Sequence, residues 1–228
     1  MKFLTARWEN LLLANYSVPQ SVLTPFVPAG TQLDAFNGTT FVSLVAFMFN
    51  RTRVLGVPIP FHTSFEEVNL RFYVSPIKNP ERRAVTFLRE IVPRSAIPLI
   101  ANTLFGENYV AMNMGHESNG KLHRYSWKNE VDNWFSGRAD RDLSLPISGS
   151  VEEFITEHYW GYSKAPVGTI EYKVEHPQWR CCKIEEYGIS VDFGKTYGER
   201  FAFLSNENPI CVQFAEGSEV SVSFPKRV

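Results

Sequence analysis

The sequence lacks any apolar run long enough to cross a membrane as a helix. No uninterrupted stretch approaches the roughly 18–20 residues that the hydrocarbon core of a bilayer requires. The opening stretch "MKFLTARWENLLLANYSVP" is interrupted by Arg7, Glu9 and Asn10 and has no small-residue cleavage site, so we expect no signal peptide. From these absences we expect a cytoplasmic protein that has no membrane partner.

An excess of charge of either sign is also lacking. The 23 Lys and Arg residues and 24 Asp and Glu residues give a net charge of −1, so we expect no nucleic-acid partner. Cysteine is scarce. Cys181, Cys182 and Cys211 form no C-x-x-C motif and no Cys/His cluster, which argues against a disulfide framework and against a zinc site. Reduced thiols are expected.

The signatures of common catalytic sites are missing too. The chain has no G-x-S-x-G elbow, no complete phosphate-binding loop, no H-E-x-x-H and no G-x-G-x-x-G after a strand. His116 and His123 face each other across an expected hairpin, but they lie near its tip, where residues are usually solvated. We therefore expect neither a metal nor another cofactor.

What the sequence has in quantity is aromatic residues and strand-forming patterns. Aromatics make up 14% of the 228 residues, led by 18 Phe, and the length suits one well-buried domain over residues 1–228. Turn signals separate many strand-like segments, and Asn37–Gly38 predicts a hairpin turn between two of them. A sheet of many strands must curl or close. We therefore predict a mainly β (α+β) fold, a single-domain antiparallel β-barrel, closed or curled, with two or three short helices.

Residues 64–76, "SFEEVNLRFYVSP", alternate with period two and predict a strand. One face of this strand is apolar and requires a core; its members are Val68, Leu70, Phe72 and Val74. The other face is mostly polar; its members are Glu67, Asn69, Arg71 and Tyr73. The strand pattern alone leaves open whether this second face meets water or a pocket.

Residues 82–92, "RRAVTFLREIV", predict another strand. Strict alternation puts Val85, Phe87, Arg89 and Ile91 on one side. Among such neighbours Arg89 needs a partner if it is buried.

Asn119–Gly120 predicts a hairpin over residues 108–128. With a two-residue loop, Met114 pairs with Tyr125 on an apolar face, whereas Asn113 and Arg124 share the opposite, polar face with Ser126 and Tyr109.

Helices and a last hairpin complete the prediction. Ser95 and Gly106 bound an expected helix with Pro98 in its first turn and a buried stripe of Ile97, Ile100 and Leu104. Ser150 and Glu153 form a capping box before a second helix. Glu216–Gly217 predicts a final hairpin, and residues 53–62, which contain two prolines, predict an irregular loop.

The composition of the polar faces favours a cavity wall. Solvated strand faces usually carry Thr, Lys and Glu, whereas Asn, Arg and Tyr with a single Glu suit a wall that hydrogen-bonds a ligand. The alternative, a face that simply meets water, stays open at this point. The candidate catalytic residues are Glu67 and Tyr109, and the candidate ligand-binding residues are Asn69, Arg71, Arg89, Asn113 and Arg124.

Several strings together resemble a known family. They are "RWENLLLANYSVPQSVLTPFVPAGTQLDAFNGTTFVSLVAF", "FEEVNLRFYV", "NYVAMNM" after a helix, and "FITEHYWGYS" followed by "VEHPQW". From near Arg7 to about Trp179 the chain is similar to the YqjF-like family of uncharacterised bacterial proteins. That family is placed in the acetoacetate decarboxylase-like superfamily, so the resemblance implies a barrel-like, mostly antiparallel fold around a small cavity.

The resemblance also limits the chemistry. The related decarboxylases form a Schiff base between a lysine and a β-keto acid, and a second adjacent cation makes that lysine nucleophilic. The corresponding place here is "GENYVAM", with Tyr109 near the nucleophile position, and no Lys-Lys pair occurs anywhere in the chain. By the same resemblance, Glu67 keeps a cavity position.

Three functions stay open. The leading hypothesis is a barrel that binds a small carboxylic or keto acid, with Arg71 or Arg89 receiving the anion and without a Schiff-base lysine. The second is a lyase, isomerase or hydrolase in which Glu67 and Tyr109 supply acid–base chemistry. The third is a non-catalytic scaffold or interaction protein. Exposed edge strands would permit a homodimer.

Overall fold

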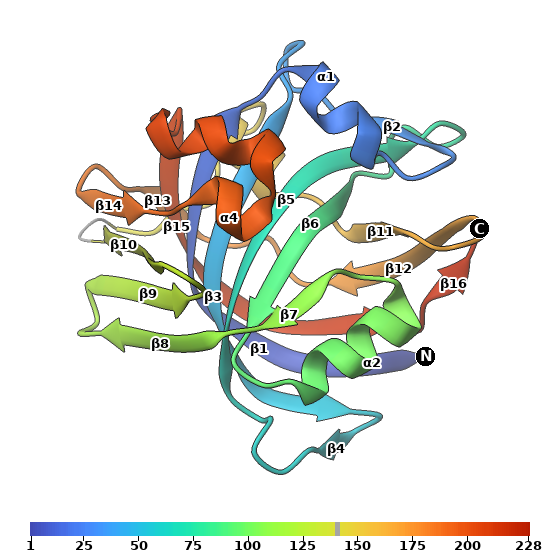
Figure 1. The fold of residues 1–228 in the computed structure, drawn as a ribbon, viewed down its shortest axis with the longest axis horizontal. Helices are drawn as coiled ribbons and strands as arrows, with labels where there is room; N and C mark the ends of the chain where they lie inside the picture. Colours follow the sequence, from blue (N-terminus) through green and yellow to red (C-terminus); the bar gives the residue numbers. More distant parts are fainter. Residues whose placement is uncertain (140–141) are drawn as a thin grey trace.

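The computed structural model describes residues 1–139 and 142–228 of the chain (Figure 1). Within these residues the strands form a twelve-stranded sheet and a four-stranded sheet. The path of the large sheet is β13 (Cys181–Lys183), β15 (Cys211–Ser223), β1 (Lys2–Ser17), β3 (Phe41–Val54), β5 (Phe65–Pro76), β6 (Ala84–Val92), β11 (Trp160–Lys164), β12 (Thr169–Glu175) and β16 (Lys226–Arg227). Three short strands pair beside it: β2 (Thr31–Leu33), β4 (Val57–Pro58) and β7 (Tyr109–Ala111).

The large sheet curls until its two ends meet. Val174 of β12 pairs with Val222 of β15, which joins the end of the path back to its beginning. The ladders are antiparallel except those of β6 with β7 and with β11. This is the mainly β, curled and mostly antiparallel barrel that the sequence predicted.

The small sheet runs β14 (Tyr187–Ser190), β10 (Asp132–Arg138), β9 (Leu122–Lys128) and β8 (Asn113–Ser118). It lies on one side of the barrel together with α4 (Phe193–Tyr197), on the left of Figure 1. The other helices are α1 (Gln20–Leu23), α2 (Ala96–Phe105), α3 (Val151–Thr156) and the 3₁₀-helices η1 (Thr24–Phe26) and η2 (Glu199–Asn206). Among the described residues, no helix has the length and apolar character needed to span a membrane.

The alternation of β5 divides the core as predicted. Its apolar face packs into one cluster with Trp127 and Phe135 of the small sheet and with Phe193 of α4. Its other side belongs to the barrel interior, where Tyr73 packs with Phe47 and other aromatic residues. The small sheet therefore covers the outside of the barrel wall, and the polar face of β5 looks inward.

Local signals predicted most of the turns and caps. Asn37 and Gly38, both with positive φ, make a tight turn closed by Phe36 and Thr39. Gly106 ends α2 with φ of 63°, which a glycine adopts at low cost. The Ser150 side chain accepts from the Glu153 N–H at 3.2 Å, as the capping box predicted, and the Glu153 carboxylate accepts from Gly149 N–H at 2.7 Å.

The prediction of a final hairpin around Glu216–Gly217 is wrong. Residues Cys211–Ser223 form one continuous strand, and Gly217 lies within it, paired with Glu9 of β1 without a shift of register at this point. Gly217 has φ of 80°, and a Cβ atom there would come within 2.0 Å of the Trp8 carbonyl oxygen. The glycine therefore serves a close backbone approach and not a chain reversal.

The structure also differs from the prediction in the loop at residues 53–62 and in the register of the β8–β9 hairpin. Residues 53–62 are not wholly irregular, because β4 pairs back onto β3 across a turn in which Leu55 and Gly56 have positive φ. In the β8–β9 hairpin the loop is longer than two residues, so that Met114 pairs with Trp127. Within this longer loop the Asn119 side chain accepts from the Leu122 N–H at 2.9 Å.

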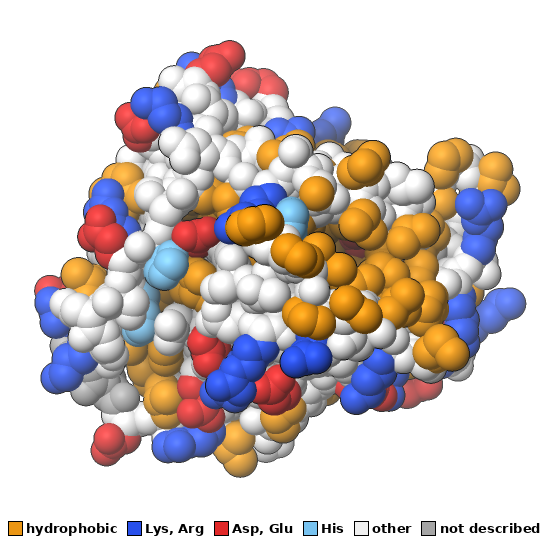
Figure 2. Space-filling model, turned by 90° about the horizontal axis from the view of Figure 1, so that it is seen from below, with side chains coloured by type: hydrophobic (Ala, Val, Ile, Leu, Met, Phe, Trp, Pro, Cys, Tyr) orange, Lys and Arg blue, Asp and Glu red, His pale blue; other side chains and the backbone are white. Residues whose placement is uncertain are grey.

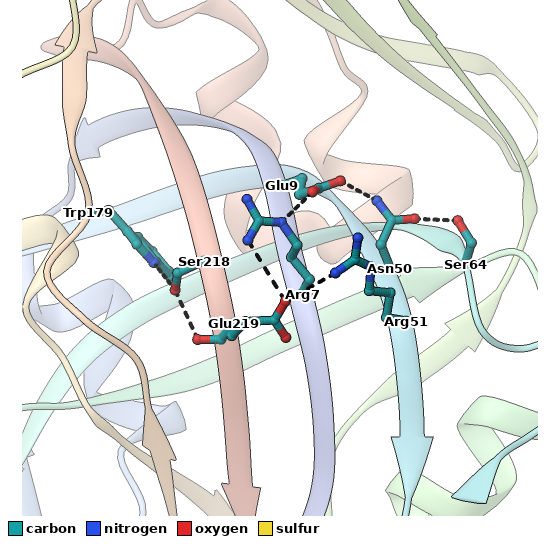
Figure 3. Close-up of polar contacts among 8 residues, drawn as sticks. All are labelled: Arg7, Glu9, Asn50, Arg51, Ser64, Trp179, Ser218 and Glu219. Atoms are coloured by element: carbon teal, nitrogen blue, oxygen red, sulfur yellow. Dashed lines mark hydrogen bonds and ion pairs between the residues drawn. The ribbon is translucent and has the colours of Figure 1, made fainter.

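A polar network on the outer surface of the barrel ties three neighbouring strands together (Figure 3). The Arg7 guanidinium donates to the Glu9 carboxylate at 2.5 Å, and the Asn50 amide donates to the other oxygen of Glu9 at 2.6 Å. Glu219 of β15 lies 3.8 Å from both Arg7 and Arg51. Because side chains alternate along β1, this network helps to fix Trp8, which points inward between Arg7 and Glu9.

Candidate active site

The barrel interior holds a cavity of about 200 Å³. Most of its wall is aromatic or aliphatic, supplied by β1, β3, β6, β12, β15 and α2; examples are Trp8, Phe47, Phe87, Phe105 and Val174. The polar side chains on the wall are Thr52, His62, Glu67, Asn69, Arg71, Glu90, Glu107, Tyr109 and Tyr172. A cavity of this kind suits a largely apolar ligand that carries a polar group.

The mouth of the cavity lies between α2 and the segment that follows β4. Ile59 and Ile100 both line the cavity and are exposed to solvent. Leu99 and Leu104 of α2 and Phe61 are exposed nearby in sequence. Figure 2 views the molecule from below, and hydrophobic side chains gather in the right half of this face. The predicted buried stripe of α2 is therefore wrong for Leu104 and Ile100, because the helix borders an opening and does not pack flat on the sheet.

Glu67 lies at the centre of the polar part of the wall. Its side chain is held by two donors: the Asn69 amide at 2.9 Å and the Tyr109 hydroxyl at 3.0 Å. The residue is 3% exposed. Burial raises the pKa of the Glu67 carboxyl to about 7, although the two hydrogen bonds and the charge of Arg71 oppose the shift. The carboxyl can therefore accept or donate a proton near neutral pH.

Two further acids stand beside Glu67 and were missed from the sequence. Glu90 of β6 lies directly across the ladder from Asn69, and Glu107 follows the cap of α2. Burial raises the pKa of Glu107 to about 8, against a hydrogen bond from Tyr172 at 2.5 Å. Burial, with the charges of Glu107 and Glu67, raises the pKa of Glu90 well above its usual value. The cavity therefore gathers three carboxyls.

Tyr109 stands between these acids. It begins β7, which pairs with β6 and so brings the ring next to the polar face of β5. Burial and the charges of Glu67 and Glu90 raise the pKa of its hydroxyl well above the usual value, so the group stays protonated and donates. The structure thus brings Glu67, Asn69 and Tyr109 into one hydrogen-bonded group.

Arg71 reaches the same cavity from β5. It is 8% exposed, and its Nη2 donates to the Ile155 carbonyl at 3.4 Å. Its Nε atom has no hydrogen-bond partner among the described residues. A buried guanidinium with an unused donor is suited to bind an oxyanion.

Arg89 does not line the cavity. Between Leu70 and Arg71 the β5–β6 register shifts, so that Phe87 faces Arg71 and Arg89 falls beside Leu70 on the outer face of the barrel. There Arg89 donates to the Thr196 carbonyl at 2.5 Å. The predicted face of Arg89 is wrong because a β-bulge breaks the alternation. The adjacent pair Arg89–Glu90 was a usable signal, since neighbours in a strand point to opposite faces and one of the two had to face inward.

Asn113 and Arg124 are also separate from the cavity. Asn113 is exposed on β8, and Arg124 on β9 lies over the Trp134 ring, 4.2 Å from its centre. Both face away from the barrel wall, because the opposite face of the small sheet carries Trp127 into the core. The structure therefore places the two polar faces that the sequence grouped together in different environments.

No lysine is among the described residues that line the cavity. Tyr109 and Val110 occupy the start of β7, where the resemblance put the nucleophile position. Within residues 1–139 and 142–228, no group of three or more His, Cys, Asp or Glu side chains is placed to hold a metal ion.

Comparisons with known proteins agree with this architecture. Residues 5–219 match the DUF2071 family, described as an uncharacterized conserved protein. The uncharacterized protein YqjF of Bacillus subtilis (strain 168) is 29% identical over 177 residues, which cover 75% of this chain and 72% of that protein.

Solved structures share the fold at low sequence identity. Acetoacetate decarboxylase from Legionella pneumophila has a TM-score of 0.68 at 9% identity, over 98% of this chain and 86% of that one. An acetoacetate decarboxylase-like enzyme from Sphingomonas wittichii RW1 has a TM-score of 0.66 at 12% identity, over 100% and 94%. The enduracididine biosynthesis enzyme MppR complexed with pyruvate has a TM-score of 0.68 at 9% identity, over 100% of this chain and 91% of that one. These comparisons confirm the resemblance to YqjF-like proteins and the acetoacetate decarboxylase-like fold.

Proposed function

The chain belongs to the DUF2071 family of uncharacterized conserved proteins, and we propose that it binds a small, partly apolar carboxylic or keto acid inside its barrel. The observation that carries this proposal is the convergence of Glu67, Asn69, Arg71 and Tyr109 on one largely apolar cavity. The apolar wall holds the carbon skeleton of the ligand, and the polar strip along β5 orients its head group.

Arg71 receives the carboxylate of the ligand. Its buried guanidinium keeps an Nε donor without a partner among the described residues, and a guanidinium fork matches a carboxylate with two parallel hydrogen bonds. The complex of MppR with pyruvate, a protein of the same fold, supports a keto acid as the class of ligand. The Tyr109 hydroxyl and the Asn69 amide orient the rest of the ligand.

The binding does not proceed through a lysine imine. A Schiff base requires an amine in the cavity, and the described residues of the cavity wall include no lysine. Borohydride treatment in the presence of a β-keto acid is expected to leave no covalent adduct, as measured by mass spectrometry of the intact protein. A lysine adduct would contradict this part of the proposal.

A second candidate function is acid–base catalysis on the same ligand, as in a lyase, isomerase or hydrolase. The Glu67 carboxyl, with a pKa raised to about 7 by burial, favours it, because a general base or acid works best when its pKa lies near the operating pH. Tyr109 would donate the proton at 3.0 Å from Glu67. Glu67→Gln separates the two functions, since the variant would still bind the acid but would not turn it over.

The test of the binding proposal is a thermal-shift screen with small carboxylic and keto acids. A ligand that binds only the folded protein raises the melting temperature by mass action. We expect Arg71→Met to weaken the binding of the best acid by about tenfold or more, as for a lost hydrogen bond to a charged group. Arg124→Met is the matched control, because Arg124 lies over Trp134 outside the cavity, and should leave the binding unchanged.

Two outcomes would contradict the proposal. Either no acid raises the melting temperature of the wild-type protein, or Arg71→Met and Arg124→Met have the same effect on affinity.

As part of the same proposal we place the protein in the cytoplasm, supported by the free thiols of Cys181 and Cys211. We keep the homodimer as an expectation, to be tested by the mass of the protein in solution.

A further inference from the structure

Of the buried oxygen atoms on the cavity wall that have no hydrogen-bond partner among the described residues, two lie on neighbouring strands: Oδ1 of Asn69 and Oε2 of Glu90. The two residues are direct neighbours across the β5–β6 ladder, and each is 2% exposed. Their side chains therefore share one face of the sheet, and that face lines the cavity. A buried acceptor without a donor is costly, which makes such a pair unusual in a folded protein.

The orientation of the Asn69 amide is fixed by its neighbour on the same strand. Its Nδ2 donates to Oε1 of Glu67 at 2.9 Å, so the amide oxygen is the atom that stays available. The Tyr109 hydroxyl donates to the other oxygen of Glu67 at 3.0 Å. These two donors are thus already used. The unpaired donors of the described wall, such as Nε of Arg71 and Nε1 of Trp8, bond to neither oxygen, so that Oδ1 of Asn69 and Oε2 of Glu90 are both open to a donor from a ligand.

The charges on the cavity wall indicate that the donor on the ligand is a cation. Three carboxyls line the cavity, Glu67, Glu90 and Glu107, against the guanidinium of Arg71 and the imidazole of His62. The mutual repulsion of the acids contributes to the raised pKa of Glu90. A cation between them would relieve this repulsion and favour their ionised forms.

We infer that Asn69 and Glu90 form a subsite for a cationic nitrogen donor, such as a protonated primary amine or an amidinium, next to the carboxylate position at Arg71. Such a group carries at least two N–H bonds, one for Oδ1 of Asn69 and one for Oε2 of Glu90, and its positive charge is matched by the surrounding acids. This inference rests on the proposed function, because it specifies the ligand of the same cavity as an acid that also bears an amine.

The spacing along β5 permits both ends of one ligand to bind. Asn69 and Arg71 are two residues apart on the same face of the strand, which separates their positions by about 7 Å. The inward face of β5 then presents, in order, an acid at Glu67, an acceptor at Asn69 and a cation at Arg71. An amino acid or a related zwitterion can lie along this strip, with its ammonium group near Glu67 and Asn69 and its carboxylate at Arg71.

The experiment uses three sets of probes on the full chain: n-alkylamines from propylamine to octylamine, the carboxylates of the same chain lengths, and the corresponding ω-amino acids. Affinities are measured by titration calorimetry at neutral pH. We expect the alkylamines to bind the wild-type protein, and Glu90→Gln to weaken amine binding by about tenfold or more while leaving the carboxylates unaffected. Arg71→Met should have the reverse pattern.

A second readout is the exchange of protons on binding. A cation next to Glu67 and Glu107, whose pKa values burial raises to about 7 and about 8, ionises them and releases protons. Calorimetry in two buffers of different ionisation enthalpy should therefore show proton release with alkylamines, and Glu90→Gln should reduce it. Glu117→Gln, on the outer sheet, is the control variant and should change neither quantity.

The outcomes separate this inference from the proposed function. If carboxylates bind and no alkylamine does, the amine subsite is refuted and the proposed function stands. If alkylamines bind and carboxylates do not, the amine subsite stands and the role of Arg71 is refuted. If neither class binds, both are refuted. Should Glu90→Gln fail to fold, Asn69→Leu tests the same subsite, and the wild-type comparison of amines with carboxylates decides by itself.

Discussion

The barrel and the small sheet carry similar polar side chains in opposite environments. On β5 and β6, Asn69, Arg71 and Glu90 are almost completely buried around a cavity. On β8 and β9, Asn113 is exposed and Arg124 is half-buried against Trp134. The comparison shows that residue type does not tell a cavity wall from an outer surface. The difference comes from which face of each sheet is covered by the rest of the molecule.

Glycine replacement should produce the largest difference between the two sheets. Gly217 in the barrel and Gly120 in the β8–β9 hairpin both have positive φ, but an added Cβ meets the Trp8 backbone at position 217 and nothing within 4 Å at position 120. We expect Gly217→Ala to cost about 4 kcal/mol, from the backbone conformation plus the clash, and Gly120→Ala about 1 kcal/mol from the conformation alone.

Urea denaturation of the two variants measures both free energies of unfolding. Equal losses of stability at the two positions would contradict the close approach of β15 to β1.

The next effect is the pH dependence of stability, which should come from the barrel acids. The pKa of Glu67 is about 7 in the folded protein against an ordinary value of 4.5, so between these pH values the folded state holds a proton that the unfolded chain releases. The free energy of unfolding should therefore fall as the pH rises from about 4.5 to about 7, by about 3 kcal/mol from Glu67 alone. Glu107, with its pKa raised to about 8, extends the fall to higher pH.

Glu67→Gln is expected to flatten this slope and to make the protein more stable than the wild type above about pH 7, where the wild type must bury a charge. Urea unfolding at a series of pH values tests it. A slope that Glu67→Gln leaves unchanged, or a wild-type stability that rises over this range, would show that the acids are more hydrated than the cavity geometry indicates.

The smallest effects are expected on the outer face of the small sheet. Arg124→Ala should cost at most about 1 kcal/mol, the value of an exposed contact between a cation and an aromatic ring, and Asn113→Ala about 0.5 kcal/mol or less. Neither variant should alter the affinity for a carboxylate or an amine. Loss of ligand binding in Asn113→Ala would break the distinction between the two sheets, and calorimetry on the two variants checks it.

Much of the fold followed from local patterns. The alternation in residues 64–76 predicted both faces of β5, and Asn37–Gly38, Gly106 and the Ser150–Glu153 box marked a turn and the ends of two helices. These signals depend on neighbouring residues and on backbone preferences, which the sequence contains directly. The Glu216–Gly217 prediction failed because a glycine with positive φ also occurs within a strand, where it lets the backbone of the neighbouring strand approach closely.

The candidate site was predicted where it lies on one continuous strand. Glu67, Asn69 and Arg71 share a face of β5 because residues two apart always do so. Glu90 was missed and Arg89 was placed in the cavity because a bulge in β6 shifts the alternation by one residue. Glu107 was missed because it lies in a loop after α2, where no periodic pattern indicates which way a side chain points.

The sequence by itself determined that the chain forms a curled, mainly β barrel and that β5 has one apolar and one polar face. Those properties follow from the period of the hydrophobic pattern, which does not depend on distant residues. Only the tertiary structure decided that the polar face of β5 lines a cavity while that of the β8–β9 hairpin lies outside. That outcome depends on the closure of the barrel through β12 and β15 and on the packing of the small sheet against its wall, both of which join residues far apart in the chain.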